Sequence, residues 1–278
     1  MEFLASVLAT LQRGLFGWVT VAVVLTVFEL LNARERIGLR QRAAGMAYWT
    51  VSIAASAVIA TAAVAMTKAY GIMPLVNLPV FSGLAWAGPL AALIAVVLAA
   101  TVNDFFFYCY HRIQHRWLWR YHAVHHSVRD LTAVNSYHHI SETVIGLLLA
   151  IPTTLVICDV GPALPFVSLI LYLHIVWIHS PTRINLGPLR ILFADNNFHR
   201  IHHSLEERHF DKNFGAFTTL WDRLFGTAHF PSRDEWPDVG LAEVDQPRTL
   251  KEWVDLPTRY RNAVIAPADH PMPVAVPG

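Results

Sequence analysis

The sequence predicts an all-α integral membrane protein, a helical bundle of three spans and a helical hairpin that carries a histidine-rich cap. Three observations predict it. Hydrophobic residues make up 54% of the 278 residues and charged residues 15%, and the mean hydropathy is +0.40, which differs from the profile of a soluble globular domain. Long uncharged runs fill the first 103 residues. Fourteen of the fifteen histidines lie between His111 and His229.

The three predicted spans come from three apolar runs. Leu15 to Leu31 contains one charge, Glu29, whereas Met46 to Thr67 and Ala69 to Asn103 contain none. About 20 apolar residues cross a bilayer as a helix, so each run is long enough. The first run is too long for the apolar part of a signal peptide and lacks an Ala-x-Ala cleavage site, so we expect it to stay as an anchor.

The basic residues predict an orientation. The loop after the first span contains Arg34, Arg36, Arg40 and Arg42, whereas the loop after the second span offers only Lys68. By the positive-inside rule the arginine loop is cytoplasmic. Three crossings then leave every histidine cluster on the cytoplasmic side.

A fourth apolar region, Thr143 to Ile178, is interrupted at residues 158–162 by Cys-Asp-Val-Gly-Pro, a turn signal. Each half has about sixteen residues, which suits a hairpin that dips into the membrane and returns. We therefore divide the chain into membrane spans (1–103), a histidine-rich region with the hairpin 143–179 inside it (104–230), and a proline-rich, charged cytoplasmic tail (231–278) that covers part of the site.

Three histidine clusters carry the chemistry. They read HxxxH at His111, HxxHH at His122 and HxxHH at His199. If each cluster lies on a helix, residues three and four apart share one face. Eight neutral imidazoles that point into one volume can hold two transition-metal ions.

Other polar residues near the clusters are candidates for the same site. His139 and His179 flank the hairpin, and we expect both to be ligands. Asp104 precedes His111 by seven residues and could accept a hydrogen bond from the far nitrogen of a ligand histidine. An ion pair with Arg112 or a neighbouring arginine is the alternative. The sequence leaves open which further histidine completes the site: His138, His139, His174 or His209. His209, His229 and His270 are expected to be surface residues, and His174 to pack or to bind something other than metal.

The clusters and their flanking text resemble the fatty acid hydroxylase/sterol desaturase superfamily over roughly residues 103–230. The flanking segments are Asn103-Asp104-Phe105, Tyr108-Cys109-Tyr110-His111-Arg112, Asp211-Lys212-Asn213-Phe214-Gly215 and Trp221-Asp222-Arg223-Leu224-Phe225-Gly226-Thr227. Trp177-Ile178-His179 and Leu186-Gly187-Pro188-Leu189 resemble the alkylglycerol monooxygenase branch. The resemblance implies a four-helix membrane bundle under a cytoplasmic cap, two iron ions held almost entirely by histidines, and the use of dioxygen to hydroxylate or desaturate lipids.

The resemblance also implies the site residues. The expected metal ligands are His111, His115, His122, His125, His126, His139, His179, His199, His202 and His203, with Asp104 and Asp222 as supporting carboxylates. His139 matches an RxHPxE-like segment, from which the chain departs at Tyr137 and Ile140.

The residues and the resemblance together predict a di-iron oxygenase that hydroxylates a lipid C–H bond. Oxidising an unactivated C–H bond needs a stronger oxidant than any side chain, and imidazole is a good iron ligand. The chain has no flavin, nicotinamide or cysteine-cluster motif, so we expect an external donor, a reductase with a cytochrome b5- or ferredoxin-like carrier. A lipid desaturase is the alternative within enzymes, and a histidine-rich metal transporter or a bis-histidine haem protein the alternative outside them. The net charge of +1 gives no reason to expect a nucleic-acid partner.

Overall fold

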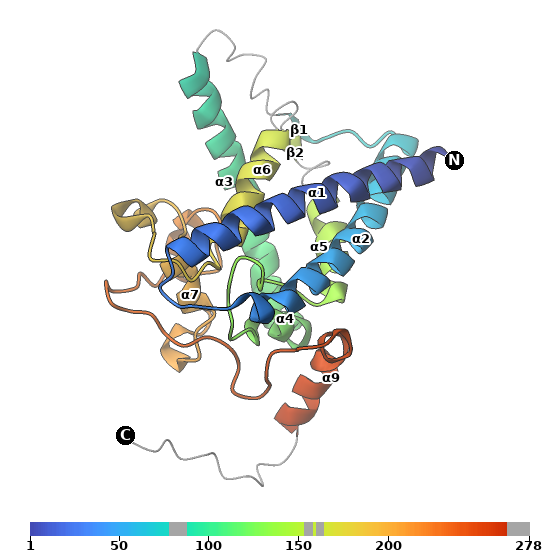
Figure 1. The fold of residues 1–278 in the computed structure, drawn as a ribbon. Coiled ribbons are helices and arrows are strands. Elements are labelled where there is room, and N and C mark those ends of the chain that lie inside the picture. Colours follow the sequence, from blue (N-terminus) through green and yellow to red (C-terminus); the bar gives the residue numbers. More distant parts are fainter. Residues whose placement is uncertain (78–87, 153–157, 160–163, 266–278) are drawn as a thin grey trace, which may run out of the picture.

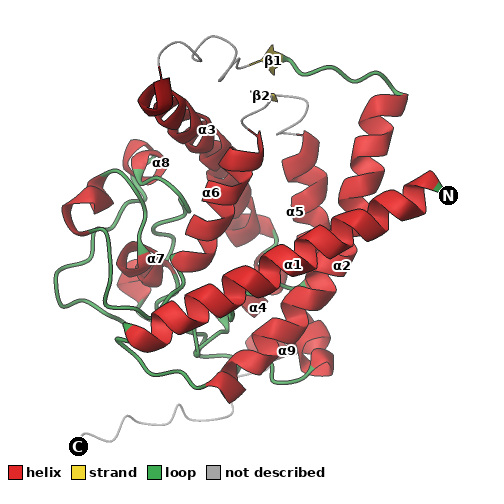
Figure 2. Ribbon diagram, turned by 45° about the horizontal axis from the view of Figure 1, so that its top comes forward, coloured by secondary structure: helices red, strands yellow, loops and turns green. Residues whose placement is uncertain are grey.

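The computed structural model describes residues 1–77, 88–152, 158–159 and 164–265. These residues form a helical fold whose strands are only two residues long (Figures 1 and 2). The helices are α1 (Glu2–Leu31), α2 (Leu39–Ala69), α3 (Gly88–Trp117), α4 (Trp119–His126), α5 (Ile140–Pro152), α6 (Leu164–Trp177), α7 (Asn196–His202), α8 (Leu220–Leu224) and α9 (Leu250–Ile265), with 3-10 turns η3 (Gly187–Ile191) and η4 (Glu207–His209). The strands β1 (Val76–Asn77) and β2 (Cys158–Asp159) pair in parallel.

The three predicted spans are confirmed as α1, α2 and α3, which are long and apolar enough to cross a membrane. At 1.5 Å per residue, 30 residues reach about 45 Å, more than the roughly 30 Å of a hydrocarbon core. The starts of all three helices differ from the predicted runs, and α2 begins at Leu39 rather than at Met46. The first helix begins at Glu2 rather than near Leu15, and the third begins at Gly88 rather than at Ala69. A turn after Ala69 ends α2, and β1 follows it.

Glu29, the one charge in the first apolar run, is buried and fully partnered. Its carboxylate forms an ion pair with Arg42, which is itself buried on α2. It also accepts hydrogen bonds from the Ala133 N–H at 2.9 Å and the Ser180 hydroxyl at 2.7 Å. A buried charge is tolerated when it is paired and hydrogen-bonded. Glu29 therefore joins α1 and α2 to the two loops that lead into the histidine site.

The predicted hairpin is present as α5 and α6, which have 13 and 14 residues. At about 20 Å each, these helices are too short to cross a bilayer. They pack between the spans, α5 against α2 and α6 against α3. At the far end, β2 pairs with β1 from the loop after α2 (Figure 1), so the hairpin is tied to the spans at both of its ends.

Residues beyond 230 pack against the histidine-bearing part of the chain. Helix α9 lies against α4 and the start of α2. Its Trp253 stacks on Tyr48 of α2, with ring centroids 4.9 Å apart, and both side chains are buried with Leu256 and Val124. Within the region expected to be a tail, residues 250–265 thus form a packed helix, while residues 266–278 lie outside the described residues.

Candidate metal centre

The first histidine group gathers five imidazoles from three helices. Their ligand nitrogens all lie within 4.8 Å of one another: His111 and His115 on α3, His122 and His126 on α4, and His202 on α7. Two pairs have i,i+4 spacing, which puts both members on one helix face. Helix α3 ends at Trp117 and α4 begins at Trp119. The short turn between them directs the histidine faces of both helices to the same group.

The second group holds four imidazoles: His125 on α4, His179 just after α6, and His199 and His203 at α7. Asp195 starts α7, because its side chain accepts a hydrogen bond from the Phe198 N–H at 2.9 Å, as an N-cap residue does. The hairpin returns His179 to the site, so that its Nε2 lies 3.3 Å from that of His125 and 3.0 Å from that of His199.

Backbone carbonyls orient the rings of both groups. Because a carbonyl oxygen only accepts, the Nδ1 that faces it carries the hydrogen and Nε2 keeps its lone pair. The pairs are His111 with Phe214 at 2.8 Å, His125 with Tyr137 at 3.2 Å, His179 with Ile175 at 2.7 Å and His202 with Lys212 at 2.8 Å.

In both groups, Nε2 atoms that carry lone pairs face each other, and this arrangement indicates what the site can bind. The Nε2 atoms of His111 and His122 are 3.1 Å apart, although each ring already donates through Nδ1, His122 to Glu142. His125 and His179 face each other in the same way at 3.3 Å. Two lone pairs at this distance repel unless a cation lies between them, and imidazole nitrogen binds first-row transition metals. The donor set therefore fits one metal ion in each group.

Several other ring nitrogens are buried without a hydrogen-bond partner. They are Nε2 of His115, His126 and His202 in the first group, and Nδ1 of His199 and His203 in the second. Buried polar atoms in proteins are rarely left unpaired. In the first group these atoms are the nitrogens that a shared ion would satisfy.

The electrostatics keep these rings neutral. Burial lowers the pKa of His125 and His126 well below the ordinary value, and neighbouring imidazoles lower each pKa further. Burial lowers the pKa of His179 to about 3. A neutral imidazole is the form that binds metal, so near neutral pH no proton has to be removed before an ion binds.

The structure adds a carboxylate that the sequence analysis did not assign. Glu142, in the first turn of α5, accepts from His122 Nδ1 at 3.2 Å and from the Gln114 amide at 2.9 Å. A carboxylate on the far nitrogen of a ligand histidine fixes its tautomer and raises its basicity. The signal was present in the sequence, since Glu142 stands in the RxHPxE-like segment.

The two predicted supporting carboxylates act on the backbone instead. Asp104 contacts neither a histidine nor Arg112; it accepts the N–H groups of Ala216, Phe217 and Thr218 at 2.9–3.1 Å. The expected roles of Asp104 as a partner of a ligand histidine and as the ion-pair partner of an arginine are therefore both wrong. Asp222 accepts the N–H groups of Phe214 and Gly215, at 2.8 and 2.7 Å, and the Thr227 hydroxyl. Both hold the loop 214–218, whose Phe214 carbonyl orients His111.

His139 lies outside both groups, which corrects its expected role as a ligand. Its Nδ1 is 2.6 Å from the Ser141 hydroxyl and its Nε2 is 3.2 Å from the Val254 carbonyl of α9. The neighbouring His138 is closer to the centre, stacked on His125 with ring centroids 3.9 Å apart. His138 is thus turned toward the site, whereas His139 is turned toward α9.

The remaining histidines have other surroundings. His174 faces the Ala194 carbonyl at 2.7 Å and belongs to neither histidine group. His209 is fully buried rather than on the surface, between Ser204 and Glu235, with His229 alongside. His270 lies outside the described residues.

Comparison with known proteins agrees with this geometry. The family model described as "Fatty acid hydroxylase" matches residues 96–227. The ornithine lipid hydroxylase OlsE of Rhizobium tropici is 33% identical over 156 residues, 52% of this chain and 45% of that protein. Human alkylglycerol monooxygenase is 30% identical over 148 residues, 50% of this chain and 31% of that protein.

A third relative, methylsterol monooxygenase 1 of Danio rerio, is 32% identical over 46% of this chain and 44% of its own length. The matched part of this chain thus spans less than half the length of these relatives. No solved structure matches the chain. The matched residues contain all nine histidines of the two groups. Eight of them belong to the three sequence clusters, and the ninth, His179, follows the hairpin. Residues 96–227 of the chain, which contain both histidine groups, are therefore similar to the fatty acid hydroxylase family.

Proposed function

We propose that this chain is a membrane-bound lipid hydroxylase that uses dioxygen and external electrons at a di-iron centre. The observation that carries the proposal is the pair of adjoining histidine groups, in which buried Nε2 lone pairs face each other at 3.1 and 3.3 Å. Relatives named as ornithine lipid hydroxylase, alkylglycerol monooxygenase and methylsterol monooxygenase support the choice of a lipid oxygenase.

The ligands divide between two ions. His111, His115, His122, His126 and His202 would hold one ion, and His125, His179, His199 and His203 the other. When bound, two iron ions would supply the reduction of dioxygen and the oxidising strength that an unactivated C–H bond requires.

The protein's own contribution is positioning and the exclusion of water. Carbonyl groups and Glu142 fix the imidazole rings before any ion arrives, so little reorganisation is needed. The lipid comes from the bilayer, since the outer faces of the three spans are apolar and exposed, as at Phe16 on α1 and Leu98 on α3. The histidine groups lie where α3 ends, and by the arginine loop we assign that side to the cytoplasm.

The reaction balances with an external donor. One C–H bond and one dioxygen, with two electrons and two protons, give one C–O–H group and one water. The same centre in a desaturase would instead remove two hydrogens from the lipid. The two outcomes differ in product mass.

The test uses the purified, iron-loaded full chain in detergent or vesicles. We expect two iron ions per chain, no Soret band, dioxygen consumption with a reductant, and one labelled oxygen atom in the lipid product under labelled dioxygen. A product that has lost two hydrogens without gaining oxygen would identify a desaturase. Absence of bound iron, or a haem spectrum, would refute the proposal.

A further inference from the structure

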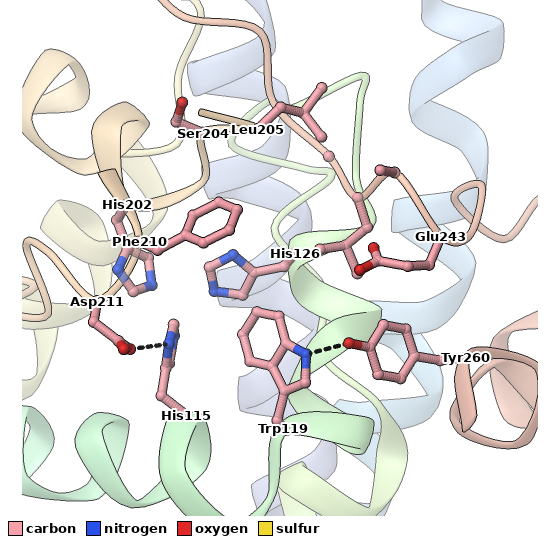
Figure 3. A pocket seen from close by; sticks show the side chains of 13 residues that line it. His115, Trp119, His126, His202, Ser204, Leu205, Phe210, Asp211, Glu243 and Tyr260 are labelled. Carbon is pink, nitrogen blue, oxygen red and sulfur yellow. Dashed lines mark hydrogen bonds and ion pairs between the residues drawn. The ribbon is translucent and has the colours of Figure 1, made fainter. Parts of the chain in front are cut away.

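A cavity of about 320 Å³ opens beside the first histidine group. Figure 3 shows His115, His126 and His202 on one side of it and Trp119 and Tyr260 on another. The three imidazoles are those whose Nε2 atoms have no hydrogen-bond partner. The cavity therefore lies directly beside three imidazoles of the first group, whose Nε2 atoms themselves are buried.

In the part of the chain that the structure describes, this cavity does not touch the second group. His125, His179, His199 and His203 are each at most 5% exposed, and the cavity is not lined by any of them. A partner that approaches through this cavity thus meets the first group before the second.

An aromatic pair links the first group to the surface of the protein. The ring of Trp119, at the start of α4, lies 4.9 Å from that of His115 and 5.0 Å from that of His126, centroid to centroid. Its indole N–H donates to the Tyr260 hydroxyl of α9 at 2.8 Å (Figure 3). Both side chains are half-buried. A continuous path of ring contacts and one hydrogen bond therefore runs from two imidazoles to α9.

We propose that Trp119 and Tyr260 form the route by which a one-electron carrier protein reduces the metal centre. The inference rests on the proposed function, because it needs a redox-active metal in the first group. Conjugated rings in contact couple electronic states better than aliphatic side chains or a water-filled gap. In each step the carrier loses one electron and the metal centre gains one, while Trp119 and Tyr260 are unchanged.

Tyr260 is the informative half of the pair. It lies on α9, beyond the residues 96–227 that match the family model. The packing of α9 on α4 is what brings its hydroxyl to the indole. The C-terminal helix therefore has a role in electron delivery in addition to its packing on Tyr48.

The experiment measures reduction of the iron-loaded full chain, without lipid or oxygen, by stopped flow. The probe is reduced [2Fe–2S] ferredoxin, with dithionite in parallel. The variants are Trp119→Leu, Trp119→Phe and Tyr260→Phe, and the control is Trp117→Leu, because Trp117 is a neighbouring tryptophan that is 72% exposed. Iron per chain is determined for every sample.

We expect Trp119→Leu to slow reduction by ferredoxin about tenfold or more, and Tyr260→Phe to slow it less, since only the hydroxyl is lost. Trp119→Phe should fall between wild type and Trp119→Leu, and Trp117→Leu should match wild type. Dithionite is small enough to enter the cavity, so it should reduce all of them at similar rates.

Two results would overturn the inference. One is reduction of Trp119→Leu and Tyr260→Phe by ferredoxin at the wild-type rate with full iron content. The other is equal slowing with ferredoxin and dithionite, which would mean that the side chains tune the metal and do not carry electrons. If Trp119→Leu loses iron, the rate at which ferredoxin reduces Tyr260→Phe decides whether the route is supported or refuted. Failure of the proposed function would show itself separately, as absent iron or absent oxygen insertion in the wild-type chain.

Discussion

Replacement of Glu142 by alanine tests whether the buried carboxylate supports the metal centre. In the wild type, Glu142 Oε1 lies 3.2 Å from His122 Nδ1 and 2.9 Å from the Gln114 amide nitrogen, and its side chain is buried. The substitution leaves His122 free to rotate or to change tautomer. It also leaves the Gln114 amide buried with one donor unpaired.

The expected magnitudes follow from these contacts. Removing the partner of a ligand histidine typically weakens metal binding about 10- to 100-fold, which corresponds to roughly 1.4–2.7 kcal/mol. The unpaired Gln114 amide costs a further 1–3 kcal/mol or so, and that cost falls on the free energy of unfolding. Metal affinity and stability should therefore both decline in Glu142→Ala.

The assay is competition for iron or zinc against a chelator of known affinity, together with thermal unfolding of the metal-free protein. Glu142→Gln keeps an acceptor oxygen but loses the charge, so its loss of affinity should be smaller. Glu207→Ala, which changes an exposed glutamate, should bind metal as the wild type does. Wild-type affinity in a folded Glu142→Ala protein would refute the reasoning.

Four further predictions concern the scaffold and the ligands. Glu29→Ala leaves Arg42 buried without its partner and should lower the free energy of unfolding by about 3–5 kcal/mol, measured by denaturant titration in detergent. A loss below about 1 kcal/mol would show that the pair is not buried in solution. His125→Ala should lower iron content and abolish turnover while membrane insertion stays intact, and full activity would contradict the ligand assignment. Gly45→Ala places a Cβ 2.3 Å from the Val134 carbonyl oxygen and should lower the midpoint of thermal unfolding by an amount equivalent to about 1–3 kcal/mol; an unchanged midpoint would argue against that contact. Burial holds the pKa of His199 and His203 well below the ordinary value, so below about pH 6.5 the unfolded chain binds more protons than the folded one. The free energy of unfolding of the metal-free protein should then fall by roughly 1.4 kcal/mol per histidine and pH unit. A melting temperature independent of pH between about 7.5 and 5.5 would exclude this.

The membrane helices and the histidine clusters were predictable from local rules. Apolar length alone identifies α1, α2 and α3, although not where α3 begins. The i,i+4 spacing of His111 with His115, and of His122 with His126, puts each pair on one helix face. Both pairs do enter the same group.

The division of the nine histidines was not predictable in the same way. His125 and His126 are consecutive, yet they belong to different groups, because successive helical residues point about 100° apart. His202 and His203 separate likewise. Which group each one joins depends on how α4 and α7 are rotated toward each other.

The sequence by itself determined that this is a membrane protein with imidazoles grouped on helical faces, since both properties depend on residues close together in the chain. Only the tertiary structure decided that His179 reaches the centre while His139 does not, and that Asp104 holds a loop more than 110 residues away. It also decided that Glu142 meets His122 and Tyr260 meets Trp119. The physical reason is that these contacts join segments brought together by helix packing, and the direction of a side chain across such a contact is not encoded in the spacing of nearby residues.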